Sequence, residues 1–450
     1  MLIIIGGDAA GMSAASRYKR RNPDGEMIVL EKTMDVSYSA CSMPYNIGDA
    51  DSLMDSLIVR KAEVFREKQG IDLRTGHEVT GIDREKKIVS GKKHDGSDFS
   101  LNYDELLIAT GTQAVVPSIP GTDLPGVFTL KTLEDGRKIK DFLAGSTVKN
   151  CVIIGMGYIA LEMAEALEKR GIGIRMVKKR PDLLPWMIPE QSSVVKDHLE
   201  EKGVELVTGQ EILVIEESSH APGGLKVKGN SAELTGEMVL VAMGVIPAAK
   251  IAGDAGLKLG PGGSIHVDNF MKTSDPSIWS AGDCADARDI VSGKDTWIPL
   301  ALTANRGGRI AADNILGDAA EFKGIAGTSV FKVFDLEVAR TGLSMEEAEA
   351  AGFDPVYADI ISKSKAHTFA DAERVHAALI GDKKTGRILG AQMVGKEGVA
   401  RRINAAAVAL QAGMTAEEFY ACDLAYAPPF SPVWDPILMA AGNLIKKLQK

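Results

Sequence analysis

The sequence twice follows a short apolar run with a glycine turn, a helical stretch and a second apolar run. In the first copy, residues 2–5 are wholly apolar, residues 6–11 hold the glycines, and residues 12–21 are helical in pattern. The second apolar run, residues 27–30, ends at Glu31, twenty residues after the last glycine of the turn. Such a unit places a pyrophosphate at a helix N-terminus and a ribose against the acidic residue. The order predicts a parallel βαβ unit that binds a dinucleotide.

The glycine pattern of this first copy departs from G-x-G-x-x-G, because Asp8 occupies the middle glycine position. A turn of this kind alone is also typical of an ordinary βαβ connection. The correctly spaced Glu31 and the apolar runs on both sides favour the dinucleotide site.

The second copy contains the better glycine motif. Residues 151–154 are an apolar run, residues 155–160 fit G-x-G-x-x-A, and a helical stretch and a strand follow. This strand ends at three cations, Lys178, Lys179 and Arg180, where a carboxylate would otherwise contact a ribose 2′-hydroxyl. Cations at this point suit a 2′-phosphate, so we expect NADPH rather than NADH. The alternative is that these cations only face solvent.

The remaining pattern predicts three domains. Apolar runs ending in glycine recur at residues 106–111, 239–244 and 273–283, so the first domain is expected to be interrupted by the second and then resumed. Residues 116–121 are rich in proline and read as a linker. We predict a first nucleotide domain over residues 1–112 and 250–322, and a second nucleotide domain over residues 113–249.

From about residue 325 the pattern of apolar and polar residues becomes typical of an α+β domain, which we predict over residues 325–450. Residues 329–338 alternate as antiparallel strands do, and residues 377–394 read as a hairpin. Helices are expected over residues 399–412 and 416–421. No element is predicted after residue 436. The fold class is therefore α/β, with two Rossmann-like domains and a C-terminal α+β domain.

Charge and hydropathy exclude several classes of function. The net charge is −9, whereas a nucleic-acid-binding protein normally has a basic surplus. No apolar run approaches the roughly 20 residues that span a bilayer. The first apolar residues are already a strand that leads into a glycine turn, so no signal peptide is expected. These features predict a cytoplasmic protein without membrane or nucleic-acid partners.

One cysteine stands apart from the others. The chain has four, Cys41, Cys151, Cys284 and Cys422, with no spacing typical of a metal site. Cys41 lies ten residues after Glu31, in the loop of residues 36–45. We interpret Cys41 as a redox thiol next to the first nucleotide site, and the other three as small apolar residues.

Taken together, the motifs resemble those of the pyridine nucleotide-disulfide oxidoreductases over essentially the whole chain. Within that family the single cysteine is similar to the branch of coenzyme A-disulfide reductases, NAD(P)H oxidases and peroxidases, and persulfide reductases. The segments that carry the resemblance are residues 6–11 with Glu31, 37–41, 109–111, 155–160, 281–283 and 426–429.

The resemblance implies FAD on the first domain, NAD(P)H on the second, and a homodimer formed by the third. The residues that it implies for FAD are Gly6, Gly7, Ala10, Gly11, Glu31, Lys32, Val79, Ala109, Thr110, Gly111, Gly282, Asp283 and Ala301. Those implied for NAD(P)H are Gly155, Gly157, Ala160, Lys178, Lys179 and Arg180.

The resemblance also implies a coenzyme A derivative as substrate, because cations and hydroxyls recur where similar reductases contact coenzyme A. These residues are Ser13, Arg17, Arg20, Ser37, Ser39, Lys68 and Asn305. The alternative for the cations of residues 17–21 is a solvated helix face. Ala40, Trp434, Thr368 and Phe369 depart from the family pattern, which leaves room for polysulfide, other persulfides or oxygen.

The expected activity is NAD(P)H-dependent reduction of a disulfide or persulfide through Cys41, which forms a mixed disulfide. No histidine follows His376, so we expect the proton donor to be Tyr426 of the partner subunit. One alternative is an oxidase or peroxidase in which Cys41 cycles through a sulfenic acid. A further alternative is an electron-transfer flavoprotein that uses no thiol.

Overall fold

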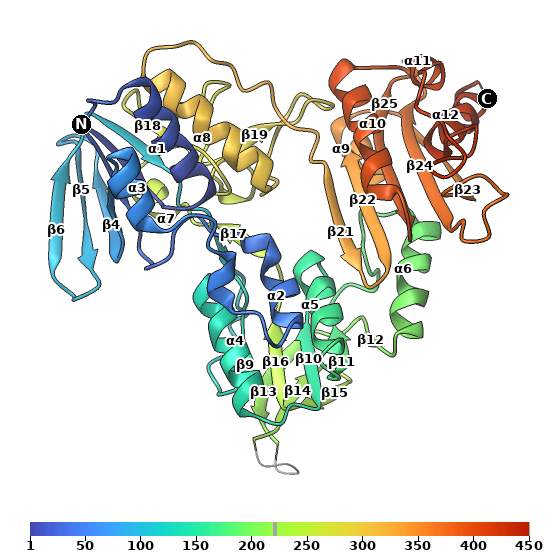
Figure 1. Ribbon diagram of the computed structural model, residues 1–450, viewed down its shortest axis with the longest axis horizontal. Helices are drawn as coiled ribbons and strands as arrows, with labels where there is room; N and C mark the ends of the chain where they lie inside the picture. Colours follow the sequence, from blue (N-terminus) through green and yellow to red (C-terminus); the bar gives the residue numbers. More distant parts are fainter. Residues whose placement is uncertain (219–222, 450) are drawn as a thin grey trace.

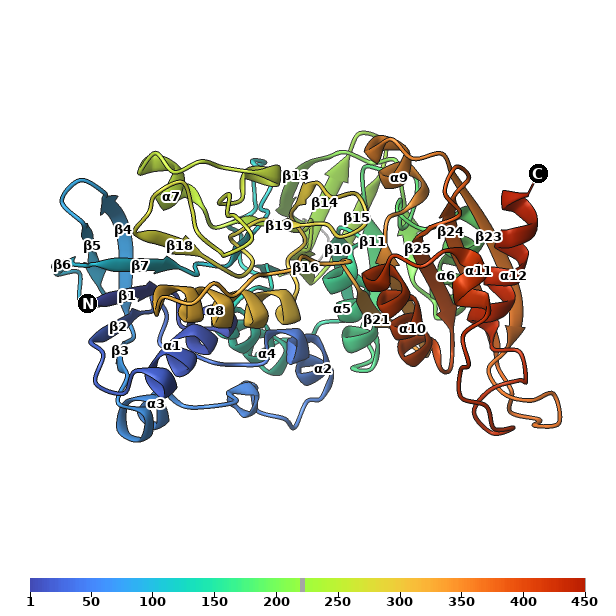
Figure 2. The same ribbon diagram turned by 90° about the horizontal axis from the view of Figure 1, so that it is seen from above.

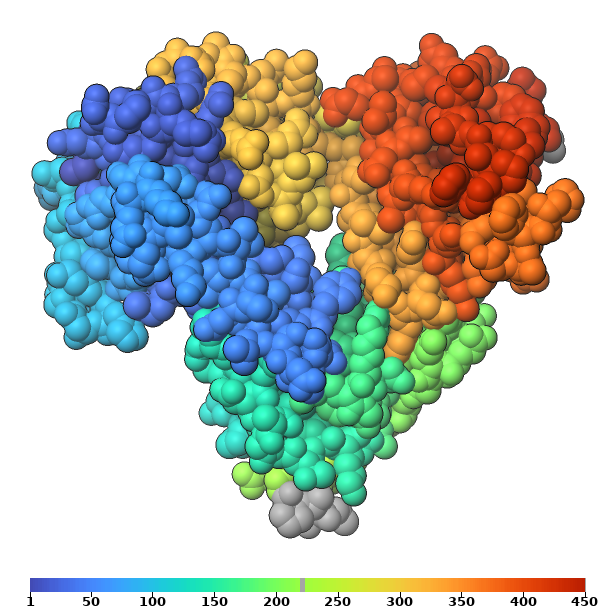
Figure 3. All heavy atoms as spheres, in the orientation of Figure 1, coloured from blue at the N-terminus to red at the C-terminus, as the bar shows by residue number. Residues whose placement is uncertain are grey.

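The computed structural model describes residues 1–218 and 223–449, which form three units (Figure 1). In Figure 1 the N-terminal unit is at the upper left, the middle unit is below it, and the C-terminal unit is at the upper right. The space-filling view in Figure 3 is hollowed between the two upper units. The mixed architecture with parallel sheets confirms the predicted fold class, whereas the exact domain boundaries stay predictions.

The first unit is built on a five-stranded parallel sheet in the order β18-β7-β1-β2-β3. Its strands are β1 (Leu2–Ile5), β2 (Met27–Leu30), β3 (Asp72–Arg74), β7 (Glu105–Ile108) and β18 (Ile278–Ser280). Strands β1 and β2 are buried along their whole length, as parallel strands covered on both faces must be. Because β18 pairs with β7, the chain returns to this sheet after the middle unit. Of the strand predicted over residues 273–283, only residues 278–280 form β18, and residues 273–277 before it form turns.

Helices and small sheets surround this core. The elements are α1 (Ala9–Arg21), α2 (Met43–Gly48), α3 (Ala62–Gln69), α7 (Lys250–Asp254), α8 (Ala301–Ile315), β4 (His77–Asp83), β5 (Ile88–Lys93), β6 (Asp98–Asn102), β19 (Ala287–Arg288), β20 (Asp295–Thr296), and the 3₁₀ turns η1 (Ala40–Ser42), η2 (Met54–Leu57) and η3 (Pro261–Gly263). Helices α1 and α8 lie side by side in both ribbon views (Figures 1 and 2). They pack through backbone contact, because a Cβ on Gly308 would lie 2.2 Å from the carbonyl oxygen of Ala10.

The middle unit repeats the plan with a parallel sheet in the order β12-β11-β10-β16-β9. Its elements are β9 (Val127–Phe128), α4 (Leu133–Gly145), β10 (Asn150–Ile154), α5 (Tyr158–Glu168), β11 (Gly173–Val177), α6 (Pro189–Glu201), β12 (Glu205–Val207), β13 (Ile212–Glu217), β14 (Leu225–Gly229), β15 (Glu233–Gly236) and β16 (Met238–Val241). The two chain crossings between the first and middle units, β8 (Thr112–Ala114) and β17 (Val245–Pro247), pair with each other as antiparallel strands.

The C-terminal unit has an antiparallel sheet in the order β21-β22-β25-β24-β23. Its elements are β21 (Ser329–Val333), β22 (Leu336–Gly342), α9 (Met345–Ala351), β23 (Pro355–Lys363), β24 (Arg374–Asp382), β25 (Ile388–Gly395), α10 (Val399–Ala412), α11 (Ala416–Tyr420) and α12 (Pro436–Leu448). The predicted hairpin is β24–β25, and both predicted helices are present. Helix α12 was not predicted, although Asp435 caps it by accepting a hydrogen bond from Ile437 N at 3.0 Å.

The middle and C-terminal units share one apolar core. Ile153, Leu161 and Leu184 of the middle unit belong to the same buried cluster as Phe331 and Val394 of the C-terminal unit. A close-packed core is hardly compressible, so one side of it cannot shift without displacing the other. The shared core therefore holds these two units in one arrangement.

No helix in the described part of the chain is long and apolar enough to cross a membrane.

Candidate active site

The first glycine turn connects β1 to α1 and is packed against the chain's own backbone. Gly6 has a φ of +111°, and a Cβ there would lie 2.2 Å from the carbonyl oxygen of Ala109. A Cβ on Gly11 would lie 1.9 Å from the carbonyl oxygen of Gly6. Both positions therefore require glycine for the turn to close onto β7 and to bring the N-terminus of α1 to the carboxyl edge of the sheet.

Glu31 is held at the same edge by the chain itself. Its Oε2 accepts a hydrogen bond from Gly7 N at 2.7 Å, and its Oε1 accepts bonds from Thr33 N at 2.8 Å and from Thr33 Oγ1 at 2.7 Å. A carboxylate has about four acceptor sites, so acceptor capacity remains after these three bonds. Glu31 thus fits the predicted ribose contact, because it is oriented beside the turn and can still accept hydroxyl donors.

Three charged groups converge next to this turn. Burial raises the pKa of Asp8 to about 6, while the backbone N–H of Tyr38 and the cation of Lys131 oppose the shift. Burial also raises the pKa of Asp283, again against Lys131. Within the described residues no side-chain partner of the Lys131 ammonium is found. The sequence reasoning missed Lys131, which lies just before the capping box of α4 and reaches the turn only through the tertiary fold.

Cys41 is exposed on η1, immediately before α2. The surrounding protein nevertheless raises the pKa of its thiol through partial burial and then through the negative charges of Glu162 and Asp283, whereas Lys131 lowers it. Glu162 belongs to α5 of the middle unit, and Asp283 follows β18 of the first unit. Groups from both nucleotide units therefore act on the one thiol.

A hydrogen-bonded pair that the sequence analysis did not predict connects the cysteine loop to the middle unit. Tyr45 of α2 donates a hydrogen bond to Glu162 Oε1 at 2.8 Å. Burial and this hydrogen bond raise the pKa of Tyr45, and burial raises the pKa of Glu162. No local sequence signal relates residues so far apart along the chain.

The second glycine turn follows β10. It differs from the first because there is open space beside one of its glycines, Gly157. A Cβ on Gly155 would lie 2.1 Å from the carbonyl oxygen of Ala242, and its φ is +121°. Gly157 has an ordinary φ of −86°, and a Cβ there would have no neighbour within 4 Å. Neither backbone nor packing requires glycine at position 157. The open space at the N-terminus of α5 fits the close approach of a pyrophosphate.

We predict that alanine at Gly157 mainly weakens nucleotide binding, whereas alanine at Gly155 mainly lowers the stability of the fold. Gly157→Ala is expected to change the stability by about 1 kcal/mol or less and to weaken NADPH binding about tenfold or more, because its methyl group enters the open space. Gly155→Ala is expected to destabilise the fold by about 2 kcal/mol through strain and backbone collision. Urea unfolding and equilibrium titration with NADPH measure both effects. Unchanged NADPH affinity in Gly157→Ala would argue against this turn as the nucleotide site.

The three cations after β11 have different surroundings. Lys178 Nζ donates to the carbonyl oxygens of Asp182 at 2.6 Å and Leu183 at 3.1 Å, so it orders its own loop. Lys179 pairs with Glu211 at 2.7 Å. Arg180 is exposed and has no charged partner among the described residues. Of the three predicted contacts, Arg180 is the one whose cation is free to meet a phosphate.

The predicted coenzyme A residues have different surroundings. Ser13 Oγ donates to Asn305 Oδ1 at 2.6 Å, which joins α1 to α8. Arg17 is engaged by Asp313 through two bonds of 2.7 and 3.1 Å, which raise the pKa of Arg17. Arg20 and Lys68 are both exposed, so their cations are more accessible to phosphate groups than that of Arg17.

Two further predicted residues shape the cysteine loop. Ser37 has a φ of 48°, and its carbonyl oxygen accepts bonds from Val59 N at 2.9 Å and Arg60 N at 3.3 Å. The hydroxyls of Ser39 and Ser42 lie 2.8 Å apart.

The other predicted cofactor residues belong to the first unit, except Ala160, which lies in α5 of the middle unit. Thr110 Oγ1 donates to the carbonyl oxygen of Ala248 at 2.7 Å. A Cβ on Gly111 would have no neighbour within 4 Å, as at Gly157. A Cβ on Gly282 would lie 2.8 Å from Ala10 Cβ. Val79 and Ala160 are buried, whereas Lys32 and Ala301 are exposed.

Tyr426 lies in the segment between α11 and α12 and is 49% exposed. No hydrogen bond or ring contact between Tyr426 and the cysteine loop is found within the described residues of one chain. The C-terminal unit exposes several other large apolar side chains, among them Val408, Phe430, Val433 and Trp434. The single chain therefore leaves Tyr426 on a surface rather than beside Cys41.

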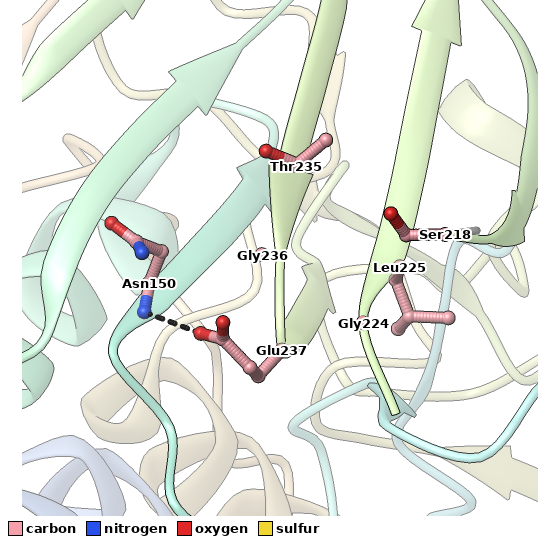
Figure 4. Close-up of a pocket in the computed structure, with 7 residues that line it drawn as sticks. All are labelled: Asn150, Ser218, Gly224, Leu225, Thr235, Gly236 and Glu237. Atoms are coloured by element: carbon pink, nitrogen blue, oxygen red, sulfur yellow. Dashed lines mark hydrogen bonds between the residues drawn. The ribbon is translucent and has the colours of Figure 1, made fainter. Parts of the chain in front are cut away.

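One surface pocket has no part in this site. Figure 4 shows it between Asn150 and Leu225, with Asn150 N donating to Glu237 Oε2 at 2.8 Å. Asn150 begins β10, so the pocket lies at the amino edge of the sheet, opposite the glycine turn. Ligands of open parallel sheets bind at the carboxyl edge, so we do not assign a nucleotide to this pocket.

Two glycine turns at the carboxyl edges of two parallel sheets, with an exposed thiol acted on from both, define an oxidoreductase that uses two nucleotide cofactors. The chain belongs to the pyridine nucleotide-disulphide oxidoreductase family: residues 1–308 match the family of that description, and residues 328–436 match its dimerisation domain. The predicted family and enzyme class, an FAD-dependent NAD(P)H oxidoreductase, are confirmed.

Individual relatives cover nearly the whole chain. The chain is 36% identical over 443 residues to an NAD(P)H sulfur oxidoreductase (CoA-dependent) from Pyrococcus furiosus, covering 98% of both. It is 34% identical over 449 residues to an NADH oxidase from Methanocaldococcus jannaschii, covering 99% of both. Among solved structures, a NAD-dependent persulfide reductase from A. fulgidus superposes with a TM-score of 0.95 at 37% identity, covering 100% of this chain and 83% of that one.

Proposed function

We propose that the protein reduces coenzyme A disulfide, or coenzyme A persulfide and polysulfide, with electrons from NAD(P)H through the single thiol of Cys41. The observation that carries this proposal is the exposed Cys41, on which Asp283 and Glu162 act from the two nucleotide units. The four cysteines all lie in described residues and all are free, so the second sulfur must come from a small molecule. The Pyrococcus furiosus relative is named a CoA-dependent sulfur oxidoreductase, which supports a coenzyme A-dependent sulfur substrate.

The reaction at Cys41 consists of two exchanges at sulfur. The Cys41 thiolate attacks one sulfur of coenzyme A disulfide, the sulfur–sulfur bond breaks, and one coenzyme A thiolate leaves. A mixed disulfide between Cys41 and coenzyme A remains. FAD, when bound, supplies the two electrons taken as hydride from NAD(P)H. Two electrons then break the mixed disulfide, which restores the Cys41 thiolate and releases the second coenzyme A thiolate. With a persulfide, the first exchange releases hydrosulfide instead.

Lys131 is the cation that favours the thiolate in this cycle. Burial and three carboxylates, those of Glu162, Asp283 and Asp8, raise the pKa of Cys41, and among the main causes of the shift only Lys131 lowers it. A thiolate, not a thiol, is the attacking group. We therefore assign to Lys131 the role of partly offsetting the burial and the carboxylates that raise the pKa of Cys41.

The departing thiolate needs a proton, and Tyr426 of a second subunit is the proposed donor. Tyr426 is exposed and has no contact with the cysteine loop in its own described chain. The match to a dimerisation domain over residues 328–436 supports a homodimer in which the C-terminal unit of one subunit covers the site of the other.

For coenzyme A we propose a site along α1 and α8. Ser13 and Asn305 supply adjacent polar groups, and Arg20 and Lys68 supply accessible cations for phosphates. Arg17 is assigned a weaker contribution because Asp313 already neutralises it. For the nicotinamide nucleotide we propose NADPH, recognised by Arg180. The A. fulgidus protein, in contrast, is named an NAD-dependent enzyme.

The proposal is tested with the FAD-loaded protein and four acceptors: coenzyme A disulfide, coenzyme A persulfide, hydrogen peroxide, and air alone. We expect NADPH consumption to be fastest with a coenzyme A acceptor and slow in air. The same assays with NADH test the nucleotide preference. Equal rates with air alone and with coenzyme A acceptors would reject the proposed substrate class.

The second candidate function is an NAD(P)H oxidase or peroxidase in which Cys41 cycles through sulfenic acid. The M. jannaschii relative named NADH oxidase favours this candidate, and so does the exposure of the thiol. Hydrogen peroxide or oxygen as the best acceptor in the same panel would support it.

A further inference from the structure

The loop that carries the three cations is fixed at both of its ends. It leaves β11 after Val177 and enters α6 at Pro189. Near its start, Lys178 binds the carbonyl oxygens of Asp182 and Leu183. Near its end, Met187 belongs to the buried core that the middle unit shares with the C-terminal unit, and Ile188 is buried as well. The loop therefore spans from the nucleotide edge of one unit to the surface of another.

One buried side chain of the C-terminal unit binds the main chain of this loop twice. Gln392 of β25 is 1% exposed. Its Oε1 accepts a hydrogen bond from Ile188 N at 2.8 Å, and its Nε2 donates to the carbonyl oxygen of Trp186 at 2.7 Å. Ile188 is the N-cap of α6 and its side chain does not cap the helix, so Gln392 satisfies main-chain groups that the helix leaves unpaired.

Other contacts lock the same junction. The guanidinium of Arg340, on the neighbouring strand β22, lies 5.0 Å from the ring centre of Trp186. Gln191 of α6 is fully buried, and its Nε2 donates to Asp359 Oδ1 at 2.9 Å and to the carbonyl oxygen of Gln392 at 3.2 Å. The strand register places Arg340 opposite Gln392.

We propose that Gln392 is a positioning residue for pyridine-nucleotide binding, because it fixes from another unit the loop that presents Arg180. This inference rests on the proposed function for the assignment of the loop to NADPH. Gln392 is buried against the main chain of the loop, and it acts through the conformation of residues 178–188. Binding is strengthened when a loop is already ordered in its bound conformation, because the cost of ordering is then smaller.

The expected effect follows from the loss of two buried hydrogen bonds. In Gln392→Met the side chain keeps its volume but can bind neither Ile188 N nor the Trp186 carbonyl oxygen. The loop then samples more conformations, and the affinity for a 2′-phosphorylated nucleotide should fall about threefold to tenfold. Because Gln392 lies outside the reacting atoms, kcat at saturating NADPH should remain within about twofold of wild type.

Thr341→Val is the matched control. Thr341 is 1% exposed in the neighbouring strand β22, and its hydroxyl lies 2.6 Å from that of Thr328, which belongs to the same unit. This variant loses a buried hydrogen bond of the same sheet but leaves the loop anchored. Gln392→Asn, which keeps an amide but is one methylene shorter, is a second variant with an expected effect in the same direction.

Two readouts on the FAD-loaded protein decide the inference. Hydrogen–deuterium exchange of residues 178–188 should become about threefold to tenfold faster in Gln392→Met and stay unchanged in Thr341→Val. Calorimetric titration with 2′,5′-ADP should show the matching loss of affinity. Exchange and affinity equal to those of Thr341→Val would overturn the role of Gln392. Should wild type bind 2′,5′-ADP no more tightly than 5′-AMP, the NADPH assignment fails, and loop exchange still decides whether Gln392 anchors the loop.

Discussion

Replacement of Cys41 by serine is expected to lower the rate of coenzyme A disulfide reduction by at least about a thousandfold. Serine fills nearly the same space, but its hydroxyl is not ionised near neutral pH and cannot form a sulfur–sulfur bond. The position is exposed, so stability should hardly change. The reduction of the bound flavin by NADPH should continue at the wild-type rate, because that step does not use the thiol. Stopped-flow absorbance separates this step from turnover.

Cys422→Ser is the control for this prediction. Cys422 is free and partly exposed like a reactive thiol, but it lies at the end of α11, where its sulfur contacts the carbonyl oxygen of Glu418 at 3.6 Å. This variant should retain full activity. Retention of full disulfide activity by Cys41→Ser would mean that the flavin reduces its acceptor without a thiol.

Replacement of Arg402 by methionine should destabilise the protein by about 3–5 kcal/mol, the usual cost of leaving a buried charge without its partner. Arg402 of α10 is 5% exposed, and its Nε donates to Asp435 Oδ2 at 2.8 Å. Its other nitrogens donate to the carbonyl oxygens of Gly398, Ser364 and Phe430. The residue therefore joins α10, the start of α12 and the segment that holds Tyr426. Urea unfolding followed by far-UV circular dichroism measures the loss.

The neighbouring Arg401 provides a matched comparison. It is exposed on the same helix, and its guanidinium donates to the carbonyl oxygen of Phe430 at 2.6 Å. Arg401→Met should cost about 1 kcal/mol or less, because water replaces the lost bond. Similar losses for the two variants would show that the buried pair of Arg402 and Asp435 has no special weight. If Tyr426 serves the partner's site, turnover should fall more in the Arg402 variant than in the Arg401 variant.

Local patterns predicted the parts of this protein that depend on neighbouring residues in the sequence. Whole apolar runs marked β1 and β10 because strands buried on both faces need no polar alternation. The glycines of both turns were recognisable because backbone geometry and close approach leave no alternative at Gly6 and Gly155. Helix α12 was missed although its apolar spacing is regular and a proline stands at its first position.

Contacts between distant segments could not be predicted in this way. Lys131 and Glu162 act on Cys41 from distant segments, and Glu162 also accepts a hydrogen bond from Tyr45 of the cysteine loop. Nothing in the local sequence of Lys131 or Glu162 indicates that meeting. Arg17 looked like a free cation on a helix face, yet Asp313, far along the chain, engages it. Sequence motifs located the two glycine turns, whereas the electrostatics of the thiol depends on how the first two units pack.

The central claim is that Cys41 stores oxidising equivalents as a mixed disulfide with a small thiol. Its most direct measurement is the intact mass of the FAD-loaded protein after one equivalent of coenzyme A disulfide, followed by peptide mapping. The account predicts one coenzyme A per chain, on Cys41, which disappears when NADPH is added. A protein that reduces coenzyme A disulfide without ever forming this adduct, or that carries it on another cysteine, would contradict the account.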